Sequence, residues 1–210
     1  MSEERRDTRP RPTMVVRGVE VHSGWLDPGA QRAMVADLRA VVAAAPLFQP
    51  ETRWGRKMSV RMTSAGRYGW VSDRRGYRYE PRHPSGVAWP PIPPSVLAVW
   101  DAITGLDRRP DCCLVNYYGE GAKMGMHQDR DEADFSWPVV SVSLGDAARF
   151  RIGGQQRGGP TESLWLDSGD VLVMGGPARL IHHGIDRVRN GSSSLLDGGG
   201  RLNLTLRVVD

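Results

Sequence analysis

The chain has 210 residues and a formal net charge of +4. That length suits one domain, which buries roughly 70% of the surface of its unfolded chain and therefore needs no disulfide or metal ion to fold. No apolar run approaches the length of a membrane span, and residues 1–12 lack the apolar segment of a signal peptide, so we expect a cytoplasmic protein. The basic residues are nearly all arginines, whose planar fork suits phosphate, but charge alone only permits a nucleic-acid partner.

Residues 1–13 are charged and rich in proline, and we predict a disordered tail there, followed by a single domain over 14–210. Asp27-Pro28-Gly29 opens a first helix, with apolar residues at helical spacing from Met34 to Ala45. A second helix follows Pro93-Pro94-Ser95 and carries Val96, Val99, Trp100 and Ile103 on one face. The stretch between the helices, about 50–93, is predicted to be irregular.

From Cys112 onward the pattern changes to short strands separated by Gly, Asp and Asn turns. The predicted strands are Cys112–Tyr118, Val139–Leu144, Arg149–Ile152, Ser163–Leu166, Val171–Met174, Leu180–His183 and Arg201–Val209. Many short strands of this kind predict a mainly β sandwich, jelly roll or barrel, with its core at about 112–209 and the two helices packed outside. Cys112 and Cys113 are adjacent, which disfavours a disulfide, so both are expected to be reduced thiols.

Two metal-binding side chains, His127 and Asp129, are two positions apart, which on a strand places them on the same face. His182 or His183 offers a third ligand. Two histidines and one carboxylate leave coordination positions open, as in the facial triad of non-haem iron(II) oxygenases. A surface hydrogen-bonded pair or a zinc site would show the same residues.

The last predicted strand alternates polar and apolar residues, so one face is entirely polar. Its polar members are Arg201, Asn203, Thr205 and Arg207. They could face solvent, or they could line a pocket for a small dicarboxylate. Asn116 and Tyr118 form a second alternating pair that supplies hydrogen-bond donors.

Residues 67–82 interleave arginines with Tyr68, Trp70, Tyr77 and Tyr79. Aromatic faces stack on nucleobases and arginines bind phosphates, so the segment could bind nucleic acid. A glycine-containing β-hairpin with exposed amphipathic side chains would have the same composition. Asp131 shares the face of His127 and Asp129, one step further along the chain, and could also be a solvated turn residue.

Several motifs, in order, resemble the AlkB family of nucleic-acid dealkylating dioxygenases of the bacterial type. They are Cys113–Tyr118, Gly121–Lys123, His127–Glu132, Val140–Gly145, Gly169–Gly176 and Arg201–Arg207, with weaker similarity at Met58–Thr63 and Gly69-Trp70. The resemblance implies a double-stranded β-helix (jelly roll) covered by a nucleotide-recognition lid at about 50–93. Members of this type carry tryptophan where this chain has Met174, which puts the packing behind the metal in question.

The resemblance also assigns roles to single residues. His127, Asp129 and His183 would hold Fe(II); His183 is chosen over His182 because the family's ligand precedes a Gly-Ile pair. Five residues would bind 2-oxoglutarate: Arg201 at its distal carboxylate, with Asn116 and Tyr118, and Asn203 and Arg207 at its metal-binding end. On the substrate side Trp70 would stack on the base, Tyr77 and Tyr79 would contact the backbone, and Asp131 and Arg157 would contact the substrate.

The activity so implied is oxidative demethylation of N-alkylated bases, such as 1-methyladenine and 3-methylcytosine, in DNA or RNA that is single-stranded or flipped out. It consumes 2-oxoglutarate and O₂ and releases formaldehyde, succinate and CO₂, and a monomer is expected. Three other functions remain open at this point. They are an RNA or tRNA demethylase, an oxygenase acting on a small molecule or protein, and a non-catalytic nucleic-acid-binding jelly roll.

Overall fold

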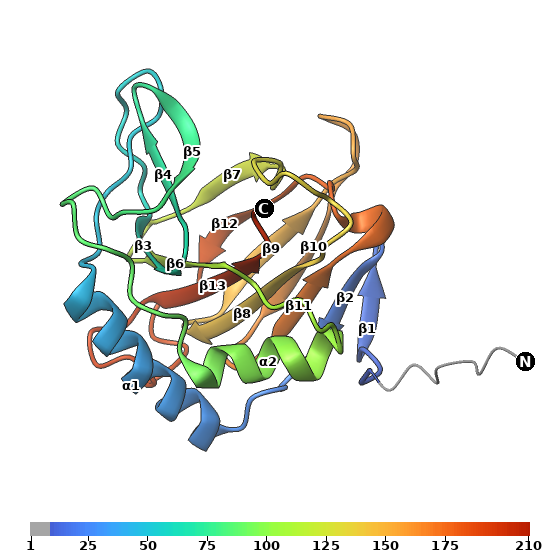
Figure 1. Ribbon diagram of the computed structural model, residues 1–210. Helices are drawn as coiled ribbons and strands as arrows, with labels where there is room; N and C mark the ends of the chain where they lie inside the picture. The colour runs from blue at the N-terminus through green and yellow to red at the C-terminus, as the bar shows by residue number, and fades with distance from the viewer. Residues whose placement is uncertain (1–8) are drawn as a thin grey trace, which may run out of the picture.

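Two antiparallel β-sheets face each other in the computed structural model, which describes residues 9–210 (Figure 1). The larger sheet has the order β1-β2-β11-β8-β13-β6-β3, and the smaller has the order β10-β9-β12-β7. The larger sheet consists of β1 (Met14–Val16), β2 (Val19–His22), β3 (Arg61–Gly66), β6 (Cys112–Tyr118), β8 (Val139–Gly145), β11 (Val171–Met174) and β13 (Arg201–Arg207). The smaller consists of β7 (Met124–His127), β9 (Ala148–Ile152), β10 (Glu162–Leu166) and β12 (His183–Val188). This is the predicted double-stranded β-helix.

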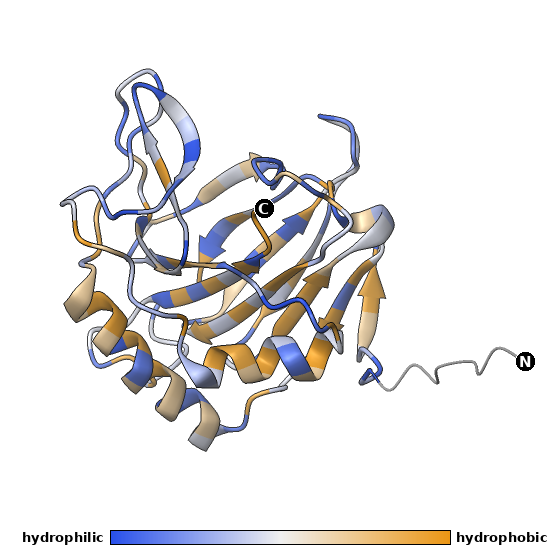
Figure 2. Ribbon diagram, in the orientation of Figure 1, coloured by the Kyte–Doolittle hydropathy of each residue, from blue (hydrophilic) through white to orange (hydrophobic). Residues whose placement is uncertain are grey.

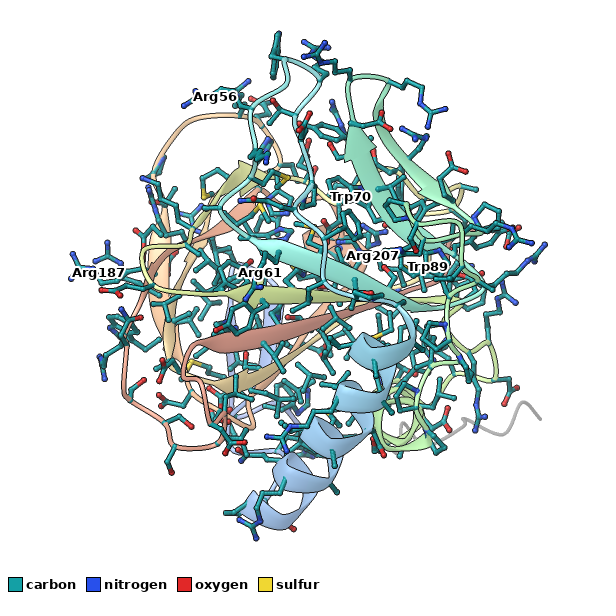
Figure 3. All side chains as sticks on the ribbon, turned by 90° about the vertical axis from the view of Figure 1, so that its left-hand side faces the viewer. Arg56, Arg61, Trp70, Trp89, Arg187 and Arg207 are labelled. Carbon is teal, nitrogen blue, oxygen red and sulfur yellow. The ribbon has the colours of Figure 1, made fainter. Side chains whose placement is uncertain are left out.

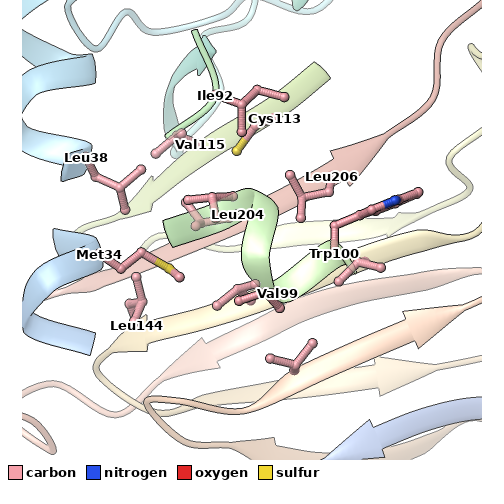
Figure 4. Packing of buried hydrophobic residues seen from close by; sticks show 14 of the residues in the cluster. Met34, Leu38, Ile92, Val99, Trp100, Cys113, Val115, Leu144, Leu204 and Leu206 are labelled. Carbon is pink, nitrogen blue, oxygen red and sulfur yellow. The ribbon is translucent and has the colours of Figure 1, made fainter. Parts of the chain in front are cut away.

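The larger sheet separates two apolar layers, because successive side chains of a strand point to opposite faces. On its outer face lie α1 (Pro28–Ala44) and α2 (Pro94–Thr104), whose apolar sides pack against the sheet (Figures 1 and 2). Met34 and Leu38 of α1 and Trp100 of α2 belong to one cluster with Leu204 and Leu206 of β13 (Figure 4). The inner face packs against the smaller sheet, and that interior also contains the site described below.

Both helices begin as predicted. The Asp27 carboxylate accepts a hydrogen bond from the Ala30 N–H at 2.8 Å and caps α1, with Pro28 at the first helical position. Helix α2 begins at Pro94 and ends at Thr104, and it is capped by Gly105, whose left-handed φ of 61° suits glycine. Neither helix is long and apolar enough to cross a membrane in the part of the chain that the structure describes. Cys112 and Cys113 are buried free thiols, as predicted.

Two expectations need correction. The irregular stretch 50–93 contains β3, which pairs with β6, and the hairpin of β4 (Gly69–Asp73) and β5 (Gly76–Glu80). The strand predicted at Leu180–His183 begins only at His183, because a 3-10 turn over Gly176–Ala178 and an irregular segment precede it. The predicted tail lies partly outside the described residues (1–8), and within 9–13 the Thr13 N–H already donates to the Val21 carbonyl at 2.8 Å.

The β4–β5 hairpin projects beyond the two sheets, near β7 (Figure 1). Trp70 and Tyr79 are paired across its two strands. Residues 50–57 lie against this hairpin, since the Glu51 N–H donates to the Ser72 carbonyl at 3.1 Å. The hairpin and residues 50–57 are called the lid below; β3, which also falls within the predicted 50–93, belongs to the larger sheet.

Candidate metal centre and its pocket

A cavity of about 710 Å³ opens between the two sheets beneath the lid. Its lining includes most of the residues singled out from the sequence: Trp70, Tyr77, Asn116, Tyr118, His127, Asp129, Asp131, Arg157, His183, Arg201, Asn203 and Arg207. These residues come from segments up to 137 positions apart, from Trp70 to Arg207, so the fold and not the local sequence brings them together. Tyr79 is the one predicted site residue that does not line the cavity.

His127, Asp129 and His183 form a cluster whose potential ligand atoms lie within 4.8 Å of one another. The Nε2 atoms of His127 and His183 lie 3.6 and 3.7 Å from the two Asp129 oxygens. His127 and His183 are register partners in β7 and β12. Gly184 permits this close pairing, because a Cβ there would lie 2.7 Å from the Met124 carbonyl oxygen.

The imidazoles are prepared to bind a metal through Nε2. His127 Nδ1 lies 2.9 Å from the Gly125 carbonyl oxygen and His183 Nδ1 lies 3.1 Å from that of Ile181. A carbonyl only accepts, so each Nδ1 carries the proton and each Nε2 lone pair is free. Burial and the neighbouring His127 lower the pKa of His183 to about 4, so its ring is neutral at pH 7. Burial opposes ionisation of Asp129, but Arg207 and the imidazoles outweigh it and hold the pKa of Asp129 well below its usual range.

His182 does not belong to the cluster; its Nδ1 lies 3.1 Å from the Gly154 carbonyl oxygen. The buried Oδ2 of Asp129 has no hydrogen-bond partner, as expected for an atom that binds a metal. Two imidazoles and one carboxylate with open positions fit Fe(II). Gln128, which sequence analysis left unassigned, donates to the carbonyls of Leu180 and Gln155 and so ties the two ligand-bearing segments together.

The polar face of β13 lines the cavity and does not face solvent. Arg201 is 1% exposed, and the only hydrogen bond of its side chain within residues 9–210 goes from Nη2 to the Ser143 hydroxyl at 2.8 Å. Its Nε and Nη1 are buried without partners, and desolvation lowers the pKa of Arg201 to about 10. A buried cation without a counter-charge is costly, so this site fits a carboxylate ligand.

The neighbouring strand completes the polar wall. Tyr118 and Asn116 of β6 are the register partners of Arg201 and Asn203. Both are buried, and Asn116 Oδ1 has no partner. Burial raises the pKa of Tyr118 to about 12, so its hydroxyl remains a donor. Together these groups offer one cation and several hydrogen-bonding groups to a small dicarboxylate.

A buried ionic network behind Asp129 was missed from the sequence. Arg207 Nη2 lies 2.8 Å from Asp129 Oδ1, and Arg207 Nη1 lies 3.3 Å from Glu132 Oε1. Glu132 also pairs with Arg179 at 3.0 Å, and Arg179 donates to the Asp129 carbonyl at 2.6 Å. The one sequence feature that could have pointed to Glu132 is its place as the last residue of the motif His127–Glu132. No sequence feature points to Arg179, since nothing in the sequence relates it to Glu132.

Tyr79 belongs to this network. Its hydroxyl donates to Glu132 Oε1 at 2.6 Å and accepts from Arg207 Nη1 at 2.8 Å. Burial raises the pKa of Tyr79, so the hydroxyl keeps its proton. The structure therefore directs the Tyr79 hydroxyl inward from the lid, towards the metal centre, whereas a contact with a nucleotide backbone was expected.

Trp70 and Tyr77 stack at the cavity mouth, with ring centroids 5.4 Å apart and an interplanar angle of 23°. The Trp70 indole N–H donates to Asp131 Oδ2 at 2.9 Å, which links two residues that the sequence presented separately. In Figure 3 Trp70 lies on the lid, above Arg207 of β13. Met174 is buried and lines the cavity, so it fills the space where the family has tryptophan.

A family model described as the 2OG-Fe(II) oxygenase superfamily matches residues 18–207. The chain is 54% identical over 198 residues to the alpha-ketoglutarate-dependent dioxygenase AlkB homolog of Caulobacter vibrioides, covering 94% of this chain and 90% of that protein. It is 42% identical over 183 residues to the alpha-ketoglutarate-dependent dioxygenase AlkB of Escherichia coli, covering 85% and 84%. A solved structure of OsALKBH1 superposes with a TM-score of 0.77 at 30% identity, covering 93% of this chain and 98% of that one. With its two-histidine, one-aspartate centre and buried arginine, the chain belongs to the AlkB family of Fe(II)- and 2-oxoglutarate-dependent dioxygenases.

Proposed function

We propose that this dioxygenase removes alkyl groups from nucleobases in single-stranded or flipped-out nucleic acid. The observation that carries the proposal is the stacked pair of Trp70 and Tyr77, with Asp131, at the mouth of the cavity that contains the metal ligands. An exposed aromatic face beside a carboxylate suits a flat ring with a positive charge or an amine at its edge. N-methylation at the pairing edge of adenine or cytosine produces such a ring.

Each residue has a defined task in this proposal. His127, Asp129 and His183 hold Fe(II), and Arg201 binds the distal carboxylate of 2-oxoglutarate, assisted by Asn116 and Tyr118. Asn203 and Arg207 contact the other end of 2-oxoglutarate. The iron, with 2-oxoglutarate and O₂, supplies the oxidation that hydroxylates the N-methyl group, with succinate and CO₂ as co-products; the hydroxylated group then leaves as formaldehyde.

The remaining residues position the base. Trp70 and Tyr77 provide the stacking surface, and Asp131 accepts the Trp70 N–H through one oxygen, which leaves the other for the base edge. Arg157 lines the cavity from the loop between β9 and β10 and is proposed to contact the substrate. The groups named above contact the edge and the face of the base and not the sugar. A methylated base in DNA and one in RNA would therefore both fit.

The test is formaldehyde and succinate release from single-stranded oligonucleotides of one sequence that contain 1-methyladenine, 3-methylcytosine or no methyl group, each as DNA and as RNA. We expect stoichiometric release from the methylated strands only. His183→Ala should abolish turnover because it removes a ligand, whereas His182→Ala should keep most of it. If the enzyme releases succinate but none of the methylated strands yields formaldehyde, it acts on a different substrate class.

A further inference from the structure

The lid carries an aromatic residue that the proposed function does not use. Trp54 is 71% exposed, the largest exposed fraction among the large hydrophobic residues of the described chain. It lies in a tight turn: the Gly55 N–H donates to the Thr52 carbonyl and the Thr52 N–H to the Arg56 carbonyl, each at 2.8 Å. Gly55 has a φ of +76°, which favours glycine. The backbone of the turn therefore holds Trp54 away from any apolar core.

The position of Trp54 relates it to the active site. Together with Trp70 and Tyr77 it lines the cavity, at the outer part of the lid, where Figure 3 shows Arg56 beyond Trp70. The guanidinium of Arg53 lies over the Trp54 ring, 4.3 Å from its centroid. The rest of the indole is open to solvent at the mouth through which a substrate strand would pass.

The charges on the lid are unevenly neutralised. Arg75 and Arg78 form ion pairs with Asp73, and Arg78 also with Glu80. In contrast, four cations near the Trp54 turn form no ion pair within residues 9–210: Arg53, Arg56, Lys57 and Arg74. Arg74 reaches this turn, since a Cβ at Gly55 would lie 3.4 Å from its Nε.

An exposed aromatic ring among unpaired cations is the pattern of single-stranded nucleic-acid binding, in which bases stack and phosphates are neutralised. We propose that the lid tip, residues 53–57 with Arg74, is a second nucleotide site. A base adjacent to the target stacks on Trp54, and the flanking phosphates bind the unpaired cations. The inference rests on the proposed function and adds a contact of Trp54 with the nucleotide next to the target base.

The first experiment compares a methylated single nucleotide, 1-methyladenosine monophosphate, with a seven-residue strand that contains the same lesion. We expect Trp54→Ala to raise the KM of the strand by about 5- to 150-fold, the range that one base stack supplies, with a much smaller effect on the single nucleotide. Trp54→Phe should restore most of the difference, because a phenyl ring also stacks. Trp165→Ala is the matched control, since Trp165 likewise carries an arginine, Arg189, at 4.1 Å but lies outside the cavity.

The second experiment measures binding of an unmethylated labelled strand by fluorescence anisotropy over a range of salt concentrations. Arg74→Gln should reduce the slope of log K against log salt by about 0.7, the value for one phosphate contact on a single strand. The neighbouring Arg75→Gln, which removes a cation already paired with Asp73, should leave the slope unchanged.

Two results would overturn the inference: an unchanged strand KM in Trp54→Ala, or equal losses for the strand and the single nucleotide. If the wild-type enzyme turns over neither substrate, the proposed function fails instead. The anisotropy experiment then still decides whether the lid tip binds a strand.

Discussion

At the scale of single residues, Arg201 shows most clearly how burial and function are connected. Its side chain is fully buried with one neutral hydrogen-bond partner, which disfavours the folded protein unless a carboxylate is bound. The alternation of β13 predicted that Arg201, Asn203 and Arg207 share a face. The pattern of a single strand does not tell whether that face is exposed to solvent or buried. Burial depends on the smaller sheet, which packs over it from elsewhere in the chain.

Replacing Arg201 by lysine should weaken the binding of 2-oxoglutarate and leave that of the oligonucleotide unchanged. A lysine keeps the charge but loses the two-pronged contact, and a hydrogen bond to a charged group contributes about 1.5–3 kcal/mol, or roughly 10- to 150-fold. We expect the KM for 2-oxoglutarate to rise by that factor while the KM for the oligonucleotide changes little. Steady-state succinate release measures both, and equal changes in the two KM values would argue against the assignment.

The bond between Trp70 and Asp131 changes how selectivity should be tested. Trp70→Ala removes the stacking surface and should weaken the binding of 1-methyladenine and of 3-methylcytosine alike, by about 1–3 kcal/mol. Asp131→Ala should instead alter the ratio of activity between these cationic bases and the neutral 1-methylguanine. Because the two side chains are hydrogen-bonded, the double variant is expected to be non-additive. Formaldehyde release from the three lesions in one strand context provides all the values, and uniform scaling by Asp131→Ala would exclude a role in selectivity.

At the scale of elements, local patterns predicted most of the fold. The helices followed from capping residues and apolar spacing, and β6, β8, β9, β10, β11 and β13 from short apolar runs. β3 was missed because its identity comes from pairing with β6, about fifty residues later. The β1–β2 hairpin was not predicted, although its sequence indicates one. Arg17 and Gly18 form its turn, with φ of 50° and 83°, and lie between two valine-rich runs.

The loop before β13 depends on one buried carboxylate. Asp146, 1% exposed, accepts hydrogen bonds from the N–H groups of Gly191, Ser193 and Gly200, the residue before Arg201. Asp146→Ala leaves these donors without their partner and should cost about 1.5–3 kcal/mol, which lowers Tm by roughly 3–12 °C in a domain of this size. Thermal unfolding checks this, with the exposed, unclustered Asp107→Ala as a reference; a shift no larger than the reference would show that the loop is held by other contacts.

At the scale of the whole molecule, the metal centre and the arginine pocket lie at the same interface between two sheets, so ligands should stabilise the entire fold. A ligand at a hundredfold excess over its Kd adds about 2.7 kcal/mol, which corresponds to roughly 5–10 °C here. We expect Mn(II), used as a redox-stable substitute for Fe(II), to raise Tm, and 2-oxoglutarate to raise it further. In Arg201→Lys the first increment should persist and the second should shrink. A full 2-oxoglutarate increment in that variant would place its distal carboxylate elsewhere.

The strand β13 presents an apolar side to one face of the larger sheet and a polar side to the other. Its even-numbered residues, Leu202, Leu204 and Leu206, hold the helices against the sheet, while its odd-numbered residues face the cavity. A library of single substitutions across Arg201–Arg207 would therefore separate under two kinds of selection. Selection for cellular abundance should remove changes at the even positions only, so tolerance should alternate residue by residue along seven consecutive codons. Selection for resistance to alkylating agents should remove changes at the odd positions as well.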